Sequence, residues 1–322
     1  MTDPTAETGT ETSFPLTHWA RETGAGLAAA LLSIAYCLSF SALLFHGPLA
    51  GGLDRGFSAL LVGSSVTGLW IAFASTLVPV AAGPNNPAVA VLAVLAGAVS
   101  GLVLGAGGDA EHAVTAVLLA FTLATLATGL ALFGLGALRL AAYVRFVPYP
   151  VIGGFLAASG WLLAVGGVKV VTGQSIDLFD LAGSFPRGTA LKLAVAVAFV
   201  AGVFAVKKAT GRMNALPMAF LAATLLLDLV LGSGVASNPE TWFLDHATRP
   251  VPWLPLSAMT RESVDWSLFA SVAAEIASAA GVTALALLLD VSALEIARAK
   301  SVDLDRELTA NGAANILSAP LG

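Results

Sequence analysis

Long apolar stretches, separated by short polar connections, run through almost the whole chain. A helix needs about 20 mostly apolar residues to cross a bilayer, and eight stretches have roughly that length. The pattern therefore predicts an all-α polytopic membrane protein with about eight transmembrane helices. The predicted spans are 25–45, 56–79, 87–105, 113–137, 147–171, 190–206, 214–233 and 267–297.

Charged residues are scarce for a chain of this length. Of the 322 residues, 57% are apolar and 11% are charged, and the mean hydropathy is +0.87, whereas soluble domains carry about 25% charged residues. The composition therefore indicates a protein whose main partner is the lipid bilayer. The net charge of −5 is thinly spread, with no basic tract of the kind that binds nucleic acid.

The sequence lacks motifs for metal binding and for enzymatic chemistry. Cys37 is the single cysteine, which excludes a disulfide framework and a cysteine-built metal site. No hydrolase, phosphate-loop or dinucleotide-binding pattern stands in a suitable context. We therefore expect neither an enzyme nor a resident cofactor or metal. The histidines are scattered over predicted loops and ends without metal-ligand spacing: His18, His46, His112 and His246.

The distribution of lysine and arginine predicts how the spans are oriented. Cytoplasmic connections are enriched in these residues, and an even number of spans puts both termini on one side. Residues 1–20 are polar and acidic, so we expect a disordered cytoplasmic tail there and a membrane domain over 21–322. This orientation suits an inner or plasma membrane. The basic residues that then lie inside are Arg21, Arg139, Arg145, Lys207, Lys208, Arg212, Arg298, Lys300 and Arg306.

The segment Gly83-Pro84-Asn85-Asn86-Pro87 separates two apolar stretches at or near membrane depth. Irregular backbone is tolerated in hydrocarbon only where it is buried in protein or lines a wet cavity, and two prolines interrupt any helix that runs through them. Transporters commonly place interrupted helices around the substrate. A simple turn at the cytoplasmic surface accounts for the same residues, so both interpretations stay open at this point.

Asn86 and Pro87 together form a favourable helix start, with the amide as the N-cap and proline at the first helical position. The new helix then runs from Pro87 to about Gly105, with the N–H groups of Ala88 and Val89 among its unpaired donors. Such an end carries a partial positive charge and directs N–H groups outward. The segment is therefore a candidate anion site.

Four carboxylates fall within predicted spans. A charged side chain at bilayer depth costs at least about 2.5 to 3.5 kcal/mol and marks a candidate functional site. Asp290 lies about 12 Å along the helix from Arg298, the first cytoplasmic cation, because a helix rises about 1.5 Å per residue. This depth inside the membrane favours a coupling-ion or proton site. Glu295 lies nearer the interface, where pairing with Arg298 or Lys300 is at least as good an explanation. The two remaining acids lie towards the outer interface: Asp228 and Glu275.

Three segments together resemble the sulfate permease (SulP) family of anion transporters. Residues 145–168, RFVPYPVIGGFLAASGWLLAVGGV, are similar to the family's fifth-span signature. Residues 286–322, which begin ALLLDVSALE, resemble the eighth span and the connection into the ninth. Residues 82–92, AGPNNPAVAVL, resemble the start of the third span, where a Gly-Pro pair precedes a half-helix. The order and spacing of the segments match along the whole chain.

This resemblance implies fourteen membrane segments arranged as two inverted repeats of seven, divided into a core and a gate. The chain then holds the first repeat and the start of the second. The substrate anion is expected between the facing N-termini of the third and tenth helices, with the first and eighth helices lining the pocket. The family position that matches Asp290 is usually acidic and helps to bind sodium in bicarbonate carriers. A homodimer is also expected from the resemblance.

Two departures from the family pattern fall on pocket positions. Where the family often has Pro-Gln before Met-Ala-Tyr in the first span, this chain reads Leu-Leu-Ser-Ile-Ala-Tyr over 31–36. The glutamine is lost, and Ser33 and Tyr36 are left as candidate hydroxyl ligands. Many members carry a small or hydroxyl residue after Gly-Pro, whereas Asn85-Asn86-Pro87 follows here. The substrate therefore cannot be taken over from the family. The candidate substrate-binding residues are Ser33, Tyr36, Asn85, Asn86, Pro87, Ala88 and Val89.

The sequence ends before a tenth helix or a STAS domain, a cytoplasmic domain that usually follows in the family. We expect either a piece of a longer product or a truncated protein. The expected function is secondary active transport of a small inorganic or carboxylate anion, such as sulfate, bicarbonate, chloride or a dicarboxylate, coupled to Na⁺ or H⁺ through Asp290. The alternatives are a nucleobase-type carrier of the same fold and a non-transporting membrane scaffold or remnant.

Overall fold

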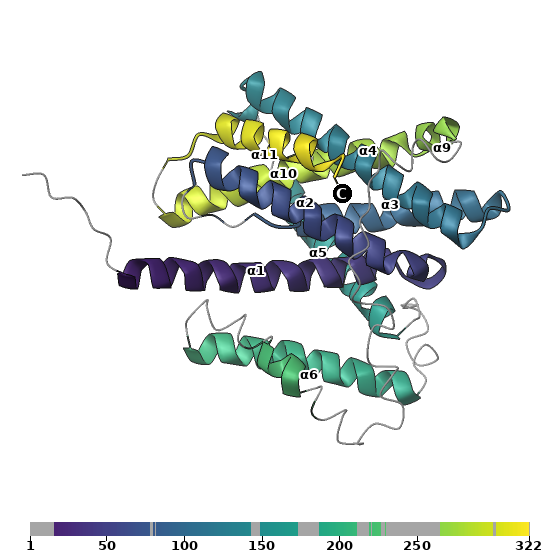
Figure 1. Cartoon of the computed structure of the whole chain (residues 1–322), viewed down its shortest axis with the longest axis horizontal. Coiled ribbons are helices and arrows are strands. Elements are labelled where there is room, and N and C mark those ends of the chain that lie inside the picture. Colours follow the sequence, from purple (N-terminus) through teal and green to yellow (C-terminus); the bar gives the residue numbers. More distant parts are fainter. Residues whose placement is uncertain are drawn as a thin grey trace, which may run out of the picture.

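The computed structural model consists of long helices, most of which lie side by side in one bundle (Figure 1). It describes residues 16–77, 80, 82–142, 149–172, 187–210, 219, 221–226, 229, 265–298 and 301–321. In chain order the first elements are α1 (Leu16–Leu44), the 3₁₀ helix η1 (Gly47–Gly52), α2 (Leu53–Ala74), α3 (Asn86–Gly105) and α4 (Ala110–Ala137). They are followed by α5 (Tyr149–Thr172), α6 (Arg187–Thr210), α9 (Trp266–Ser271), α10 (Ala273–Arg298) and α11 (Leu304–Ser318).

Seven of the described helical segments are long and apolar enough to cross a membrane. They correspond to seven of the eight predicted spans, and the predicted all-α polytopic fold is confirmed. The remaining prediction, 214–233, lies mostly outside the described residues. The predicted span 267–297 is divided, because α9 ends before Val272 and α10 begins after it.

Helix α1 begins earlier than the sequence predicted. Residues 16–20 belong to this helix, whereas residues 1–15 lie outside the described part, so the expected disordered tail stays a prediction. Proline is well tolerated in the first turn of a helix because its missing N–H has no partner there. Pro15, directly before Leu16 in the sequence, is therefore compatible with this early start.

Helix α4 occupies the centre of the bundle. It packs against α3, α10, α11 and η1, and half of its most apolar window is buried, the largest share among the candidate spans. Val114, Val117 and Ala120 of α4 belong to the main hydrophobic cluster, which also includes Leu95 and Val99 of α3. By contrast, α6 packs against α5 and lies apart from the other helices in Figure 1.

Glycines allow α4 and α11 to approach closely. A side chain on Gly129 of α4 would meet the Ile316 backbone nitrogen at 2.8 Å, and one on Gly312 of α11 would meet the Phe133 Cα atom at 2.7 Å. Gly136 faces Asp305 and Thr309 in the same way. Close backbone contact at small residues is the usual basis of helix association in lipid, so these two helices form the tightest pair in the described fold.

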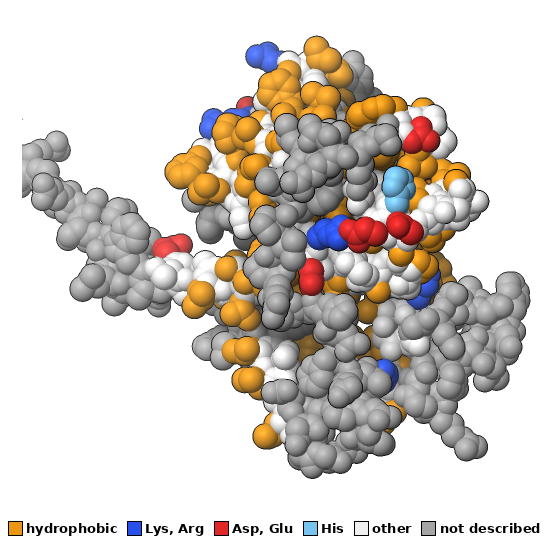
Figure 2. Space-filling view, turned by 45° about the vertical axis from the view of Figure 1, so that its right-hand side comes forward, with side chains coloured by type: hydrophobic (Ala, Val, Ile, Leu, Met, Phe, Trp, Pro, Cys, Tyr) orange, Lys and Arg blue, Asp and Glu red, His pale blue; other side chains and the backbone are white. Residues whose placement is uncertain are grey.

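Large apolar side chains cover much of the described surface, as the hydrophobic colouring in Figure 2 shows. Phe73, Leu69 and Leu27 each expose about two thirds or more of their area, an arrangement that suits contact with lipid. Charged groups are concentrated at helix ends. Arg55 at the start of α2 pairs with Glu111 at the start of α4, which places these two ends on the same side of the bundle.

Candidate functional site

The predicted break between the second and third spans is present. Helix α2 ends at Ala74 because Ser75 has extended backbone angles (φ −72°, ψ 147°). No helix includes the described residues from Ser75 to Asn85, and α3 begins directly after them. Asn85 is extended at φ −83° and ψ 119°, and its side-chain oxygen accepts a hydrogen bond from the Ala88 N–H at 3.2 Å.

The N-cap is therefore Asn85, and the prediction of Asn86 is wrong by one residue. Asn86 is the first helical residue and Pro87 the second. Proline lacks an N–H group, and the first turn of a helix has no intrahelical partner for one. Pro87 is consequently compatible with either Asn85 or Asn86 as the N-cap. The hydrogen bond from the Ala88 N–H to the Asn85 side chain decides for Asn85.

The donors at this helix end also differ from the prediction. The Ala88 N–H is taken by the Asn85 side chain at 3.2 Å, and the Val89 N–H bonds to the Asn85 carbonyl oxygen at 3.1 Å. Neither is left unpaired. The groups without a hydrogen bond to another described residue include the Asn86 backbone N–H and the side-chain NH₂ groups of Asn85 and Asn86. The positive end of the helix dipole remains at this point.

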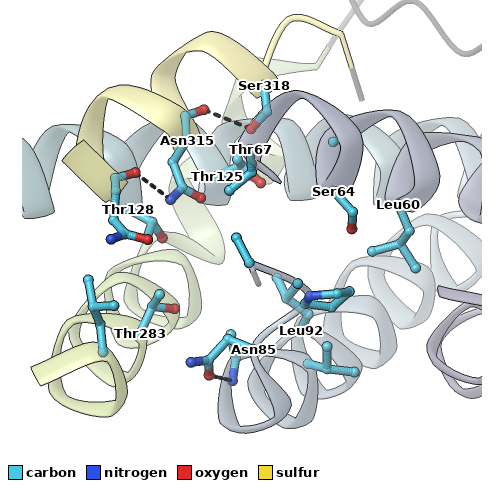
Figure 3. A pocket seen from close by; sticks show the side chains of 18 of the residues that line it. Leu60, Ser64, Thr67, Asn85, Leu92, Thr125, Thr128, Thr283, Asn315 and Ser318 are labelled. Atoms are coloured by element: carbon cyan, nitrogen blue, oxygen red, sulfur yellow. Dashed lines mark hydrogen bonds between the residues drawn. The ribbon is translucent and has the colours of Figure 1, made fainter. Parts of the chain in front are cut away.

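A cavity of about 360 Å³ lies beside the start of α3. Its walls come from the end of α1, α2, the segment before α3, α3 itself, α4, α10 and α11. Figure 3 shows side chains of several of these elements around one space. Asn85 lies on one side, while Asn315 and Thr128 lie across from it (Figure 3). Several hydroxyl and amide groups mix with leucines in this lining, which is typical of binding sites for small solutes. Its uncharged polar side chains are Ser64, Thr67, Ser75, Asn85, Thr122, Thr125, Thr128, Thr283, Asn311, Asn315 and Ser318.

Some of the predicted site residues line this cavity and others do not. Asn85, Ala88, Val89 and Asp290 are part of the lining, whereas Asn86 and Pro87 are outside it. The Asp290 side chain is exposed rather than enclosed by the described residues. The structure therefore brings predicted residues from α3 and α10 to one cavity, and their roles in binding stay predictions.

The two candidates from the first span lie outside the cavity lining. Tyr36 is 46% exposed and stacks on Phe40 with ring centroids 5.8 Å apart. Ser33 lies close to residues 75–85 between α2 and α3, which we call the broken segment. A Cβ atom on Gly83 of this segment would stand 4.0 Å from the Ser33 hydroxyl oxygen. The structure therefore does not bring these two residues to the cavity, and their predicted role in substrate binding stays a prediction.

The other predicted intramembrane acids do not line the cavity or lie outside the described residues. Glu295 accepts a hydrogen bond from the Val302 N–H at 3.4 Å, while the side chains of its predicted partners Arg298 and Lys300 are not described. One carboxylate oxygen of Glu275 is buried without a hydrogen-bond partner among the described residues. Neither glutamate is in the cavity lining, and Asp228 lies outside the described residues.

Helix α11 was not predicted, yet it supplies one whole wall of the cavity. Glu307, Asn311, Asn315 and Ser318 all line it, at the three- and four-residue spacing that places side chains on one helix face. This spacing of polar groups within a stretch rich in alanine was the available signal. The stretch is too short and too polar for a span prediction, which is why hydropathy missed it.

Glu307 is buried and connects α11 to the broken segment. Its exposed fraction is 3%. One carboxylate oxygen accepts hydrogen bonds from the Thr76 N–H and the Thr76 hydroxyl, both at 2.6 Å, and the other accepts from the Ser75 hydroxyl at 2.9 Å. Sequence reasoning did not consider this carboxylate, because it lies outside the predicted spans.

Comparison with known proteins identifies the family of the chain and a similar fold. A sequence profile described as the sulfate permease family matches residues 21–322. The chain belongs to the sulfate permease family. Among solved structures, this family member is similar to the transmembrane domain of the cyanobacterial bicarbonate transporter BicA, with a TM-score of 0.64 and 18% sequence identity. The match covers 93% of this chain and 71% of that one, and at this identity it shows the fold alone.

A curated relative of this sulfate permease family member is a vacuolar basic amino acid transporter of Saccharomyces cerevisiae. The two are 23% identical over 341 aligned positions, which cover 97% of this chain. The chain spans 31% of the length of the yeast protein. Both relatives are named as transporters, and the family is one of transporters rather than enzymes.

Replacing Asn85 by alanine is expected to lower the free energy of unfolding by about 1 kcal/mol, because the Ala88 N–H loses its cap. Asp109 offers a matched control, since it caps α4 in the same way by accepting from the His112 N–H at 2.7 Å and lies outside the cavity lining. Thermal unfolding in detergent should show similar losses for Asn85→Ala and Asp109→Ala. A loss for Asp109→Ala alone would contradict the assigned cap.

Proposed function

We propose that this chain forms part of a secondary active transporter that carries a small inorganic or carboxylate anion across a membrane. The observation that carries the proposal is the cavity at the start of α3, where the Asn85 amide and a helix N-terminus line the space. Helix N-termini favour anions through their dipole and their N–H groups. Membership of the sulfate permease family and the fold of a bicarbonate transporter support the same class of solute.

Coupling to Na⁺ or H⁺ is assigned in this proposal to Asp290. Its carboxylate lines the same cavity, and no hydrogen bond to another described residue satisfies it. A carboxylate next to an anion needs a compensating positive charge, and a sodium ion or a proton supplies it. Cation and anion then bind together, which is the physical basis of coupled transport.

The proposal places the protein in the inner or plasma membrane with a cytoplasmic N-terminus and as a homodimer. The basic residues of the predicted inner connections support this orientation. The dimer rests on the family resemblance.

Uptake into liposomes containing the purified protein tests the function. Labelled sulfate, bicarbonate, chloride and a dicarboxylate are offered in turn, with and without a sodium or proton gradient, and uracil is included to test the nucleobase alternative. Gradient-dependent uptake of one anion supports the proposal. Uptake of uracil alone would establish the alternative, and no uptake of any solute would favour the membrane scaffold.

A second candidate is a carrier of amino compounds that bear a positive charge. The ionisable groups that line the cavity are Asp290 and Glu307, and the described lining contains no Lys, Arg or His. Asn311 and Asn315 donate their amide N–H groups to their own helix, at 2.9 and 2.8 Å, so their oxygens remain as acceptors. An acceptor-rich wall suits an ammonium group. The yeast relative, named as a transporter of basic amino acids, supports this candidate.

The variant Asn85→Asp separates the two candidates. Aspartate retains the helix cap, because its carboxylate accepts from the Ala88 N–H as the amide does, but it adds a negative charge at the cavity. A unit charge a few ångströms away in a partly wet site changes binding by about tenfold or more. We expect a KM about tenfold higher if the substrate is an anion. A lower KM for lysine or arginine uptake would instead support the amino-compound carrier.

A further inference from the structure

We infer that Glu307 is a positioning residue, which holds the broken segment so that the start of α3 faces the cavity. The inference rests on the proposed function in one respect, namely that substrate binds beside this helix start. Glu307 lies on α11, far from α3 in the sequence, and its contacts are with Ser75 and Thr76 at the other end of the broken segment. Glu307 also lines the cavity, but both of its carboxylate oxygens are taken by Ser75 and Thr76, so the role inferred here is to hold the segment.

The hydrogen bonds require Glu307 to act as an acceptor at both oxygens. The Thr76 backbone N–H can only donate, and it donates to Glu307 at 2.6 Å. The Ser75 hydroxyl oxygen already accepts from the Leu77 N–H at 3.0 Å, which leaves its own proton for Glu307. An ionised carboxylate meets these demands, because it is acceptor-only. A glutamine at this position presents an NH₂ group to one of these donors.

The start of the broken segment depends on this carboxylate, because the described residues offer Ser75 and Thr76 few other partners. The Ser75 N–H continues the helical pattern of α2 by bonding to the Ile71 carbonyl at 3.0 Å, and beyond it the helix offers no partner. The Thr76 N–H goes to Glu307, and the Leu77 N–H goes to Ser75, which Glu307 holds. Backbone groups at membrane depth need such partners. Glu307 thus organises three successive residues at the point where the chain leaves α2.

The same helix forms the anchor and the cavity wall. Asn311 and Asn315 follow Glu307 by four and eight positions and line the cavity, and the glycine contacts at Gly129 and Gly312 fix α11 on α4. A rigid α4–α11 pair therefore sets the position of Ser75 and Thr76. Through the short chain that follows, it also sets where Asn85 and α3 begin.

Asp305 provides a matched control on the same helix. Its carboxylate also accepts from a backbone N–H, that of Ala141, at 3.1 Å, but this contact ties α11 to the end of α4 and not to the broken segment. Glu307→Gln and Asp305→Asn make the same chemical change. Hydrogen exchange of the detergent-solubilised chain, read in the peptides that contain Thr76 and Ala141, compares them without any substrate.

We expect Glu307→Gln to speed exchange at Thr76 and Leu77 by about tenfold or more, since hydrogen bonds to charged groups are among the strong ones. Asp305→Asn should instead speed exchange at Ala141 and leave Thr76 unchanged. Thr76→Val, which removes one hydroxyl donor and keeps Glu307, should act in the same direction by a smaller factor and serves if Glu307→Gln does not fold. Unchanged exchange at Thr76 in Glu307→Gln or Thr76→Val, or an equal effect of Asp305→Asn there, would overturn the inference.

Transport kinetics supply the second measurement. Glu307→Gln is expected to raise KM for the transported solute about fivefold or more with a smaller change in the maximal rate, while Asp305→Asn leaves KM unchanged. An unchanged KM in Glu307→Gln, with faster exchange at Thr76, would reduce Glu307 to a structural role and overturn the inference. If the unmodified protein transports none of the tested solutes, the proposed function fails, and the exchange experiment still decides whether Glu307 holds the segment.

Discussion

Replacing Asp290 by asparagine is expected to abolish the dependence of uptake on Na⁺ or H⁺ and to lower the initial rate by at least about tenfold. Asp290 lines the cavity on α10, and the described lining contains no Lys, Arg or His, so the coupling cation is the expected partner of the carboxylate. Removing one partner of a close charge pair typically costs about 2 to 5 kcal/mol. Asparagine has nearly the same shape, so the fold should be preserved. The measurement is initial uptake at several sodium concentrations and several pH values.

Glu295→Gln is the matched control for this substitution. Glu295 lies on the same helix, but it is outside the cavity lining and accepts a hydrogen bond from the Val302 N–H. Its replacement should leave the cation dependence intact. Cation-dependent uptake that persists in Asp290→Asn, or that is lost equally in Glu295→Gln, would remove Asp290 from the coupling mechanism.

Gly312→Ala should destabilise the fold more than other single-methyl additions, with an expected loss of about 3 kcal/mol in the free energy of unfolding. The added methyl group would stand 2.7 Å from the Phe133 Cα atom and nearer still to its backbone nitrogen. Backbone cannot rotate away as a side chain can, so α4 and α11 would have to separate. Overpacking of this kind costs about 1 to 3 kcal/mol, and more where backbone must move.

Gly97→Ala on α3 shows what a methyl group does without such a neighbour. Nothing lies within 4 Å of the position that its Cβ atom would take, and alanine is favoured over glycine inside a helix by about 1 kcal/mol. Thermal unfolding in detergent should therefore show a rise or no change for Gly97→Ala and a clear fall for Gly312→Ala. Equal behaviour of the two variants would contradict the close α4–α11 packing.

Hydropathy was sufficient to predict the spans of the described helices, because a bilayer demands long apolar helices whatever their packing. The residues at which each helix begins and ends were harder to predict. Val272, the single residue between α9 and α10, is as apolar as its neighbours, so nothing in the pattern marked the division there. The start of α1 at Leu16 was missed because residues 1–20 were judged by polarity alone.

Around the break, the chemistry of single residues was predictable and the exact register was not. Pro84 and Pro87 made an interruption certain, since no helix passes through both. Two adjacent asparagines, however, are equally good caps by type. The choice of Asn85 depends on backbone angles and on the reach to Ala88, which belong to the folded chain. Asp290 was identified because a charge in an apolar run stands out.

The wall formed by α11 lay beyond what a search for spans can find. The helix has 15 residues, and its first turn carries two acids, Asp305 and Glu307, so the stretch resembles a polar connection. Its role arises from tertiary contacts, namely glycine packing on α4 and the burial of Glu307. The same burial explains why this carboxylate was overlooked, because nothing in its local sequence indicates that Ser75 and Thr76 would enclose it.

The separation of Glu307 from its partners has a consequence for biosynthesis. Ser75 and Glu307 are 232 positions apart, and at about 5 to 20 residues per second the ribosome needs on the order of ten to fifty seconds to make the intervening chain. During this interval the Glu307 carboxylate is not yet present to accept hydrogen bonds from Ser75 and Thr76. Their polar groups must then bond to water or to the insertion machinery. The first spans therefore enter the membrane with an unfinished junction, and the cavity closes only when α11 is delivered.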